Sequence, residues 1–594
     1  MGRKMTDPGL RASVGRLLVS PFLLSALFLF VLVSCSAERS PSDIHILPSE
    51  RLADWSVAGV WENGVKGIPN RTVVFCDVKT SIPGSGLVAA GDGIQDDTAA
   101  LQAAITLCPA GQIVYVPQGT YRITDTLAIT KGIVVRGDGP DRTKIVQQSP
   151  RHVFVIQGLA AHVDDYVTDL TSGYSRGSDS VVITDPGKFN VGDVVTVDQL
   201  NDPSLVTHIG EGGACTWCGR ANGARAMAET LLVKEKNGNT LKFNRPLYYD
   251  YKAQYQPQLY KASGAPVRNA GIEDLYIEIA AGNTEGGGVI MSYCVHCWLK
   301  NIESYNIPYK HVEMEWGAYG NEIRDSYIHE TPRHDSDHGY GMNIHCYASD
   351  NLVENNILYY LHTGIVLGGA GGAGNVVGYN YLERTEHHQP SWFQYHIGAH
   401  GAHTYMNLWE GNVAGKLQFD AYWGSGSHHM VFRNHLTRLN PGQPVTSDIA
   451  AAIVDAHSYY MTFVGNILGT PGCPGPAEQT PLASRWENPV LWIIGYAESS
   501  GTGAPDDPEV AQTLIRSGNW ECANNSVQWT TQERSIPDSL YLSSKPAWFG
   551  ILDWPPFTPE RTDFNPDNIN KIPAQVRFEN GPAIGFPHTT PKGY

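Results

Sequence analysis

Histidine is concentrated in one part of this chain. Fourteen of the 21 histidines lie between His329 and His457. The imidazole side chain has an unperturbed pKa of about 6.5, so it can accept or donate a proton near neutral pH. Contact with solvent does not select histidine, because lysine, glutamate, serine and threonine suit a hydrated surface equally well. The clustering therefore indicates a site at which protons are transferred.

Alternating apolar residues predict which of these side chains face outward. In a strand that covers a core, apolar residues point inward and the residues between them point to the other face. Leu417 and Phe419, with Phe432, are expected in the core, whereas Gln418 and Asp420 are expected to face water. The same phase in neighbouring stretches gives one outward face with these candidate catalytic residues: His396 as general base, His345, Asp420 and His457, with Tyr422 and Arg384 at the edge.

Residues around this face supply contacts for a sugar chain. Flat aromatic rings stack on apolar surfaces, and cations or amides bind carboxylates and hydroxyls. The substrate-binding candidates are Gln394, Gln418, Lys416, Arg333, Trp392, Trp423 and His388. Zinc or another transition metal would use several of the histidines with Asp337, Asp420 and Asp455, whereas calcium, the favoured ion, prefers oxygen ligands. Its candidate ligands are Glu313, Glu315, Asp335 and Asp337.

A repeat positions these residues. Short apolar-rich segments recur, and one position in each is occupied by Ser304, Ser326, Asn356, Asn380, Asn412, Asn434 and Asn466. A repeat of a few tens of residues made of short strands is typical of a solenoid, and here it fits the coils of a parallel β-helix. Asparagines at the same point of successive coils are expected to stack their amides as an internal hydrogen-bonded ladder.

The most specific stretch lies upstream of the repeat. Residues 91–105 read Gly-Asp-Gly-Ile-Gln-Asp-Asp-Thr-Ala-Ala-Leu-Gln-Ala-Ala-Ile, and residues 114–121 read Val-Tyr-Val-Pro-Gln-Gly-Thr-Tyr. Together they resemble the N-terminal entry of the pectate-lyase-like superfamily. The resemblance implies an all-β, right-handed parallel β-helix whose open N-terminal end is covered by a short helix. Asp97 or Thr98 is expected to cap that helix.

Sequence patterns also divide the chain. Basic residues, an apolar run from Leu17 to Val33 and the lipobox-like Leu-Val-Ser-Cys ending at Cys35 predict a lipoprotein signal peptide over residues 1–35. Cys35 would carry the lipid, which makes the protein an exported bacterial lipoprotein anchored to a membrane. Residues 36–70 are expected to form a linker and 71–470 the β-helix, with a small antiparallel β insertion at about 160–262. Residues 471–594 are expected to form an irregular tail over the helix end.

Charge and cysteine content add further expectations. The formal net charge of −17 opposes nucleic-acid binding, and we expect a monomer. Export permits disulfides. Eight cysteines form the candidate pairs Cys76–Cys108, Cys215–Cys218, Cys294–Cys297 and Cys473–Cys522. The two Cys-x-x-Cys pairs allow a four-thiolate zinc site instead.

The resemblance implies a polysaccharide as the substrate, since the superfamily includes lyases, polygalacturonase-like hydrolases, alginate epimerases and tailspike depolymerases. The histidines and Arg384 favour a lyase that cleaves a uronate-containing polysaccharide by β-elimination. The alternatives are a glycoside hydrolase of the polygalacturonase-like kind and a glycan-binding surface lipoprotein without enzymatic activity.

The lipobox gives a first testable prediction. Replacing Cys35 with Ser removes the thiol that would be acylated, so the exported protein should move from the membrane fraction to the soluble fraction. Fractionation followed by immunoblotting measures this shift, and a Cys346→Ser variant serves as the control. Unchanged partitioning of the Cys35→Ser protein would contradict the lipobox assignment.

Overall fold

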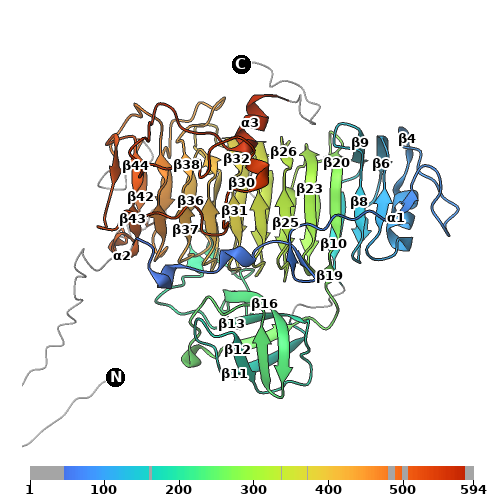
Figure 1. Ribbon diagram of the computed structural model, residues 1–594, viewed down its shortest axis with the longest axis horizontal. Helices are drawn as coiled ribbons and strands as arrows, with labels where there is room; N and C mark the ends of the chain where they lie inside the picture. Colours follow the sequence, from blue (N-terminus) through green and yellow to red (C-terminus); the bar gives the residue numbers. More distant parts are fainter. Residues whose placement is uncertain are drawn as a thin grey trace, which may run out of the picture.

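The computed structural model describes residues 46–158, 164–335, 337–370, 372–478, 489–497 and 506–581, so the expected signal peptide and Cys35 lie outside the described residues. The body is a right-handed parallel β-helix whose coils advance from right to left in Figure 1. One wall, here called the long sheet, contains ten parallel strands: β7 (Leu127–Ile129), β10 (Phe154–Gln157), β21 (Val289–Ser292), β24 (Lys310–Glu315), β27 (Tyr340–His345), β30 (Thr363–Gly368), β33 (Ile397–Ala399), β36 (Leu417–Phe419), β39 (Ala452–Val454) and β42 (Trp492–Ile494).

Two further parallel ladders complete each coil. One contains β3 (Val74–Asp77), β5 (Ile113–Tyr115), β8 (Val134–Arg136), β20 (Gly271–Ile279), β23 (Trp298–Tyr305), β25 (Glu322–Arg324), β28 (Leu352–Glu354), β31 (Val376–Gly378), β34 (Leu408–Glu410), β37 (Met430–Phe432), β40 (Thr462–Val464) and β43 (Ile515–Ser517). The other contains β4 (Asp92–Asp96), β6 (Gly119–Ile123) and β9 (Thr143–Gln147), the second halves of β20 and β23, then β26 (Tyr327–His329), β29 (Ile357–Leu361), β32 (Tyr381–Thr385), β35 (Val413–Ala414), β38 (His435–Leu436), β41 (Ile467–Leu468) and β44 (Asn519–Glu521).

The interior combines an apolar core with amide ladders. Leu417, Phe419 and Phe432 are buried in one cluster, as the alternating pattern predicted. The expected asparagine ladder is also present, because each side-chain amide donates to the oxygen of the next over 2.9–3.1 Å, through Asn356, Asn380, Asn412, Asn434, Asn466 and Asn519. A second ladder, not predicted, runs through Asn321, Asn351, Asn375 and Asn407.

The helix α1 (Thr98–Leu107) covers the N-terminal end, and Ala100, Leu101, Ala104 and Ile105 form its buried face. The expected cap is not made by Asp97, which accepts hydrogen bonds from the backbone amides of Ala90 and Gly91 instead. Its carboxylate therefore fixes the turn before the helix. No helix in the described part of the chain is long and apolar enough to cross a membrane.

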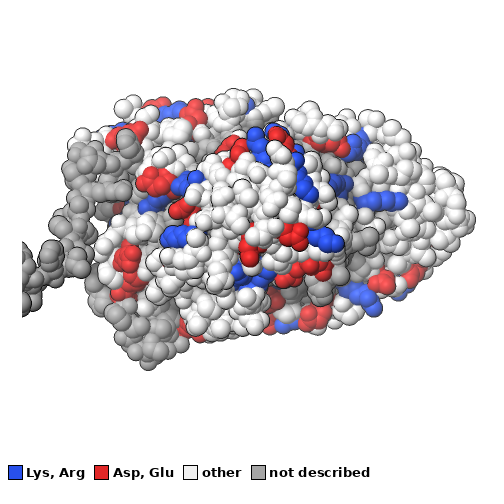
Figure 2. Space-filling model, turned by 90° about the horizontal axis from the view of Figure 1, so that it is seen from below, with Lys and Arg blue, Asp and Glu red and all other residues white. Residues whose placement is uncertain are grey.

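The antiparallel insertion is a closed barrel that hangs below the β-helix in Figure 1. Acidic and basic side chains are intermixed on the molecular face on which it lies (Figure 2), so no single sign of charge dominates there. In barrel order its strands are β11 (Tyr166–Ser172), β12 (Ser180–Ile183), β17 (Thr240–Phe243), β16 (Met227–Asn237), β13 (Val194–Gln199) and β18 (Gln258–Lys261).

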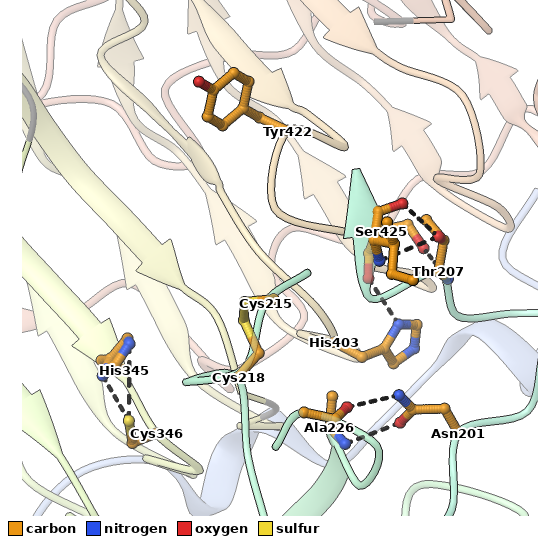
Figure 3. The surroundings of a disulfide bond; sticks show 12 residues. Asn201, Thr207, Cys215, Cys218, Ala226, His345, Cys346, His403, Tyr422 and Ser425 are labelled. Atoms are coloured by element: carbon orange, nitrogen blue, oxygen red, sulfur yellow. Dashed lines mark hydrogen bonds between the residues drawn. A yellow bond between two sulfur atoms is a disulfide. The ribbon is translucent and has the colours of Figure 1, made fainter. Parts of the chain in front are cut away.

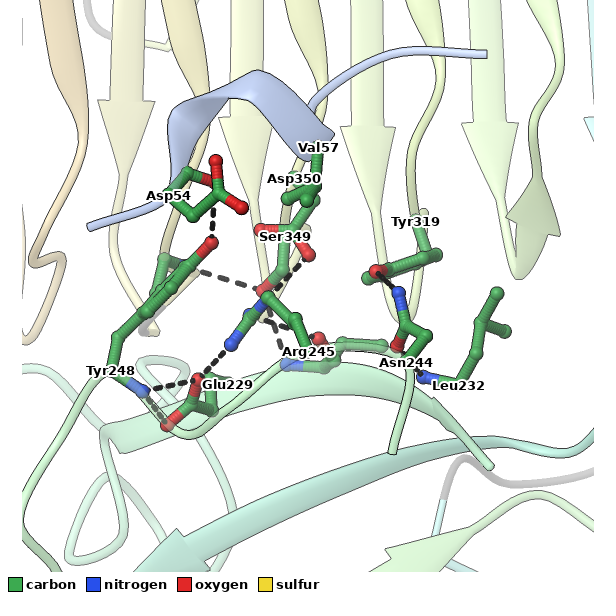
Figure 4. A network of polar contacts seen from close by, with 12 residues as sticks. Asp54, Val57, Glu229, Leu232, Asn244, Arg245, Tyr248, Tyr319, Ser349 and Asp350 are labelled. Carbon is green, nitrogen blue, oxygen red and sulfur yellow. Dashed lines mark hydrogen bonds and ion pairs between the residues drawn. The ribbon is translucent and has the colours of Figure 1, made fainter. Parts of the chain in front are cut away.

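A buried ion network fastens the barrel to the helix. Arg245, which follows β17, donates to Asp350 of the β-helix over 2.7 Å and to Glu229 of the barrel over 2.6 Å. All three side chains are almost completely buried (Figure 4). Removing one partner of a buried charge pair typically costs several kcal/mol because the other charge is left unpaired. The network therefore holds the barrel in one position on the helix.

Residues 46–66 form a strap along the β-helix. The expectation that residues 36–70 form a linker is therefore wrong for the part that the structure describes. Arg51 donates to the carbonyl of Thr513 over 3.0 Å, the Trp55 indole donates to the carbonyl of Met406 over 2.8 Å, and the Gly59 amide donates to the carbonyl of Asp350 over 2.9 Å. Trp55 is completely buried. The strap thus crosses several coils and lies tightly packed on the helix.

The expected C-terminal tail also differs from the structure. The ladders continue beyond residue 470, because β42, β43 and β44 pair in parallel with β39, β40 and β41. Later residues run back along the side of the helix, where the helix α3 (Pro573–Glu579) packs near the middle coils, at the top of Figure 1. The tail therefore covers a flank of the solenoid.

Two of the four expected disulfides are present. Cys215 is bonded to Cys218, and Cys473 to Cys522. The pairs Cys76–Cys108 and Cys294–Cys297 are not bonded; the four thiols are free and buried. The disulfide at Cys215 and Cys218 also removes the thiolates that the alternative zinc site requires.

The asparagine ladder yields a stability prediction. Asn412→Ala removes the acceptor of both the side-chain and the backbone amide of Asn380, each now 3.0 Å from it. Each orphaned buried group costs roughly 1–3 kcal/mol, so the free energy of unfolding should fall by at least that amount. Urea denaturation measures it, with the exposed Asn570→Ala as the control. Equal stability of the two variants would argue against the ladder as a stabilising element.

Candidate active site

The outer face of the long sheet carries two rows of side chains. Strand register places Glu313, Asn343, Val366, Gly398 and Gln418 in one row. A second row begins with Glu315 and His345 and continues, beyond the ends of β33 and β36, with His400 and Asp420. Neighbouring strands lie about 4.8 Å apart, so Glu313 and Asn343 are one strand spacing apart, whereas Gly368 on the intervening strand separates His345 from His400.

Lys310 holds two carboxylates at one end of this face. Its ammonium lies 2.7 Å from Glu313 and 3.4 Å from Asp337. Asn343 donates a second hydrogen bond to Glu313 over 2.9 Å, and Tyr309 donates to Asp337 over 3.1 Å. Although burial opposes its charge, Lys310 has a raised pKa because of Glu313 and Asp337. The arrangement therefore favours the charged form of Lys310 and fixes Glu313 and Asp337 around its ammonium group.

Glu315 and His345 differ from their neighbours in protonation. Burial, and then the negative charge of Glu313, raise the pKa of Glu315 to about 7. Burial and the nearby Lys310 lower the pKa of His345 to about 3, so this ring is neutral at pH 7. The site thus offers a carboxylic acid, Glu315, that can hold its proton near neutral pH and lies next to a second carboxyl group, Glu313.

Ligand atoms of Glu313, Glu315 and His345 lie within 4.8 Å of one another, so this trio is the candidate metal site among the described residues. It fits calcium poorly, because one donor is a nitrogen and calcium prefers six to eight oxygens. The Lys310 ammonium also already occupies a position 2.7 Å from Glu313. Asp335, another expected ligand, is paired with Arg333 instead.

His400 and Asp420 form a second pair on the face. Their side chains approach to 2.8 Å, and the His400 ring stacks on Tyr422 with 5.7 Å between centroids. Burial favours the neutral ring, but the Asp420 carboxylate outweighs it and raises the pKa of His400. The prediction that Gln418 and Asp420 face water is wrong: they are only 5% and 3% exposed.

A loop of the insertion covers part of the face near this pair. The short strands β14 (Ile209–Gly210) and β15 (Gly213–Ala214) pair antiparallel, and the Gly212 amide donates to the carbonyl of Tyr422 over 2.7 Å. The Cys215–Cys218 disulfide lies in the same loop, beside the strand that carries His345 (Figure 3). This loop covers the end of β36 and so accounts for the low exposure of Gln418 and Asp420, although both lie on the outer face of the sheet.

Three residues expected in the same cluster lie elsewhere. His396 is completely buried against Phe393 and Lys416, and burial lowers its pKa to about 3. Lys416, expected to bind substrate, forms a fully buried ion pair with Asp448 at 2.7 Å. Gln394 donates to the Thr363 hydroxyl over 2.7 Å in the interior. Loops that pack over the start of β33 enclose these residues, so their expected outward exposure is wrong.

Other candidates are also separated from the cluster. Arg384 lies on β32 and packs over the Tyr360 ring, and the half-exposed His457 is near Asp507. Arg333 binds Asp335 and Glu285 at the opposite ends of the strands. His388 and Trp392 both pack near His387, whereas Trp423 packs on Tyr422 and therefore lies beside the cluster. Of the predicted catalytic residues, the structure brings His345, Asp420 and Tyr422 to the same face.

Sequence reasoning missed Lys310, His400 and Trp217. Lys310 is not among the predicted residues, although a basic residue three positions before Glu313 is a usable signal. His400 lies one residue beyond the end of β33 (Ile397–Ala399), whereas the alternating pattern predicts side-chain direction only within a strand. Trp217 belongs to the insertion, and its proximity to the face depends on long-range packing.

Comparison with known proteins gives partial matches. Residues 87–191 match the family model described as Rhamnogalacturonase A/epimerase, pectate lyase-like. A probable glucan endo-1,3-beta-glucosidase of Arthroderma benhamiae is 40% identical over 70 residues, which are 12% of this chain and 8% of the relative.

Two solved structures also align in part. The tailspike protein gp49 from Pseudomonas phage LKA1 aligns with a TM-score of 0.44 and 17% identity, over 63% of this chain and 56% of that one. The Gp54 tailspike of Acinetobacter baumannii bacteriophage AP22 aligns with a TM-score of 0.45 and 14% identity, over 67% and 58%. The chain thus spans less than two thirds of each of these relatives, so similarity alone does not assign it their activities.

The His400–Asp420 pair can be tested directly. In Asp420→Asn the negative charge that raises the pKa of His400 is lost while burial remains, so this pKa should fall below its usual value of about 6.5. NMR titration of the imidazole protons measures the change, with the exposed His388 as an internal reference. An unchanged His400 titration would show that the two side chains do not interact in solution.

Proposed function

We propose that this member of the pectate-lyase-like superfamily of parallel β-helices is an enzyme that cleaves a polysaccharide at the outer face of its long sheet. The observation that carries the proposal is the closeness of two carboxyl groups, Glu315 and Glu313, of which Glu315 has its pKa raised to about 7 by burial and by the negative charge of Glu313. The partial matches to a family named for rhamnogalacturonase and to a probable glucan endo-1,3-beta-glucosidase support a carbohydrate substrate.

The chemistry that these groups favour is hydrolysis. Glycoside hydrolysis uses one carboxylic acid to protonate the leaving oxygen and one carboxylate to assist attack on the sugar. Glu315 is the proton donor, since a group with a pKa near the working pH transfers protons efficiently. Glu313 or Asp337 supplies the carboxylate. Lys310 stays bound to both carboxylates and holds them in position.

The lyase expected from the sequence has less support. β-Elimination needs a base and a group that neutralises the substrate carboxylate. The expected base, His396, is completely buried, and the expected cation, Arg384, lies on another wall. Lys310 is already engaged with two carboxylates. A uronate would therefore meet an acidic surface, which disfavours its binding.

Location is a separate part of the proposal. The basic start, the apolar run and the lipobox-like ending at Cys35 support export and lipid anchoring. An enzyme placed outside the cell can reach polymers that do not cross membranes, which agrees with a polysaccharide substrate.

Incubation with a panel of polysaccharides tests this function. The panel contains a β-1,3-glucan, rhamnogalacturonan, polygalacturonate and alginate, and both new reducing ends and unsaturated uronates are measured. Hydrolysis produces reducing ends only, whereas β-elimination produces both in equal amounts. Equal amounts would establish the lyase instead. Absence of both products from every polymer would favour a glycan-binding protein.

Glu315→Gln gives a mechanistic prediction. Loss of the proton donor should lower kcat by roughly 10²-fold or more on the substrate that the panel identifies. Wild-type activity should decline as pH rises through about 7, because Glu315 then loses its proton, and the remaining activity of the variant should lack this decline. Glu235→Gln, an exposed position on the insertion, is the matched control. Full activity of Glu315→Gln would remove this residue from the mechanism.

A further inference from the structure

Trp217 is an exposed aromatic residue at the edge of the proposed site. It is 39% exposed, and Tyr422 is 37% exposed. The Trp217 ring stacks on His345 at 5.6 Å and 25°, and meets Trp423 edge-on at 5.7 Å. Trp423 in turn meets Tyr422 at 5.2 Å. The three residues Trp217, Tyr422 and Trp423 form a continuous set of rings, here called the aromatic rim.

The rim joins both parts of the site. His345 lies under Trp217, and His400, the partner of Asp420, stacks on Tyr422. Trp217 of the insertion and Tyr422 of the β-helix therefore lie beside the same row of polar side chains, the row that contains His345 and His400. No residue of the insertion has a place in the acid–base chemistry proposed above, so that chemistry does not account for the exposed Trp217 ring.

The loop that carries Trp217 is held rigidly. The Cys215–Cys218 disulfide closes a loop around it, and both cysteines are fully buried. Cys218 packs on Gly369 of the β-helix so closely that an added Cβ there would lie 2.5 Å from its sulfur. The neighbouring Arg220 amide donates to the Tyr347 hydroxyl over 2.6 Å. A rigid aromatic side chain loses little conformational entropy when a ligand stacks on it.

The charges near the rim indicate the kind of sugar. Glu315 and Asp420 are the ionisable acids of the adjoining row. The two arginines of the loop, Arg220 and Arg225, are both paired with Asp198. A negatively charged sugar would therefore find no unpaired arginine in this loop, whereas a neutral ring with an apolar face can stack on the aromatic rings.

We propose that the insertion contributes a sugar-binding subsite, in which Trp217, fixed by the Cys215–Cys218 disulfide, stacks with Tyr422 and Trp423 around a neutral sugar unit next to the cleavage position. This inference rests on the proposed function for its placement beside the reacting bond. It makes the insertion part of the substrate site and makes substrate binding depend on one disulfide.

Steady-state kinetics with β-1,3-glucan oligosaccharides test the subsite. Trp217→Ala should raise KM roughly 10-fold and leave kcat within about twofold, because the ring contributes binding and not proton transfer. Trp217→Phe should restore most of the affinity. The double variant Cys215→Ser/Cys218→Ser should raise KM as well, whereas Cys473→Ser/Cys522→Ser, at the other disulfide, should not. An unchanged KM in Trp217→Ala, or an equal effect of both disulfide variants, would overturn the subsite.

Calorimetric titration separates this inference from the proposed function. The same oligosaccharides, and polygalacturonate oligomers of equal length, are titrated into the wild type and Trp217→Ala. Binding of the neutral oligomers that is lost in Trp217→Ala supports the subsite even if no polymer is cleaved, in which case only the proposed function fails. If a polymer is cleaved but the wild type and Trp217→Ala bind the oligosaccharides equally well, the subsite is ruled out and the proposed function stands. Preferential binding of the polygalacturonate oligomers would contradict the assignment of a neutral sugar.

Discussion

Register between parallel coils is the constraint on which the remaining structure depends. The side-chain amide of Asn412 donates to Asn434 over 2.9 Å, and the backbone amide of Asn412 donates to the same oxygen. A shift of one residue would break both bonds and turn every inward side chain outward. The same register sets Glu313 beside Asn343, and the next outward residues of these strands, Glu315 and His345, also lie close together. The position of each reacting group is therefore fixed by amides buried in the helix interior.

Burial gives the site its chemistry. Glu315 holds its proton near neutral pH because the surrounding protein and Glu313 oppose its charge. A loop of the inserted barrel covers part of the outer face of the long sheet. The barrel itself is held in place by the almost fully buried network of Arg245, Glu229 and Asp350. Stability and function are linked here, since charges far from the reacting bond determine where the covering loop lies.

The sequence allowed the scaffold to be predicted, but only part of the site. The entry motif of residues 91–105, the asparagine repeat and the alternation at Leu417 and Phe419 are local patterns, and the fold follows from them. The error at His396 has a different origin, because its burial depends on loops from other coils. Trp217 is likewise 128 residues from His345 in the chain, yet the two rings stack. Spacing along one segment carries no information about such contacts.

The strap of residues 46–66 changes how the solenoid should lose its structure. A stack of coils in which each contacts only its neighbours is expected to fray from either end, one coil at a time. Arg51 binds near β43, Trp55 near β34 and Gly59 near β28. Separation of the C-terminal coils must therefore also detach a segment that holds the middle of the molecule. Because of the strap, several coils should unfold together and not one at a time. Proteases that attack frayed ends should therefore find fewer open ends to cleave.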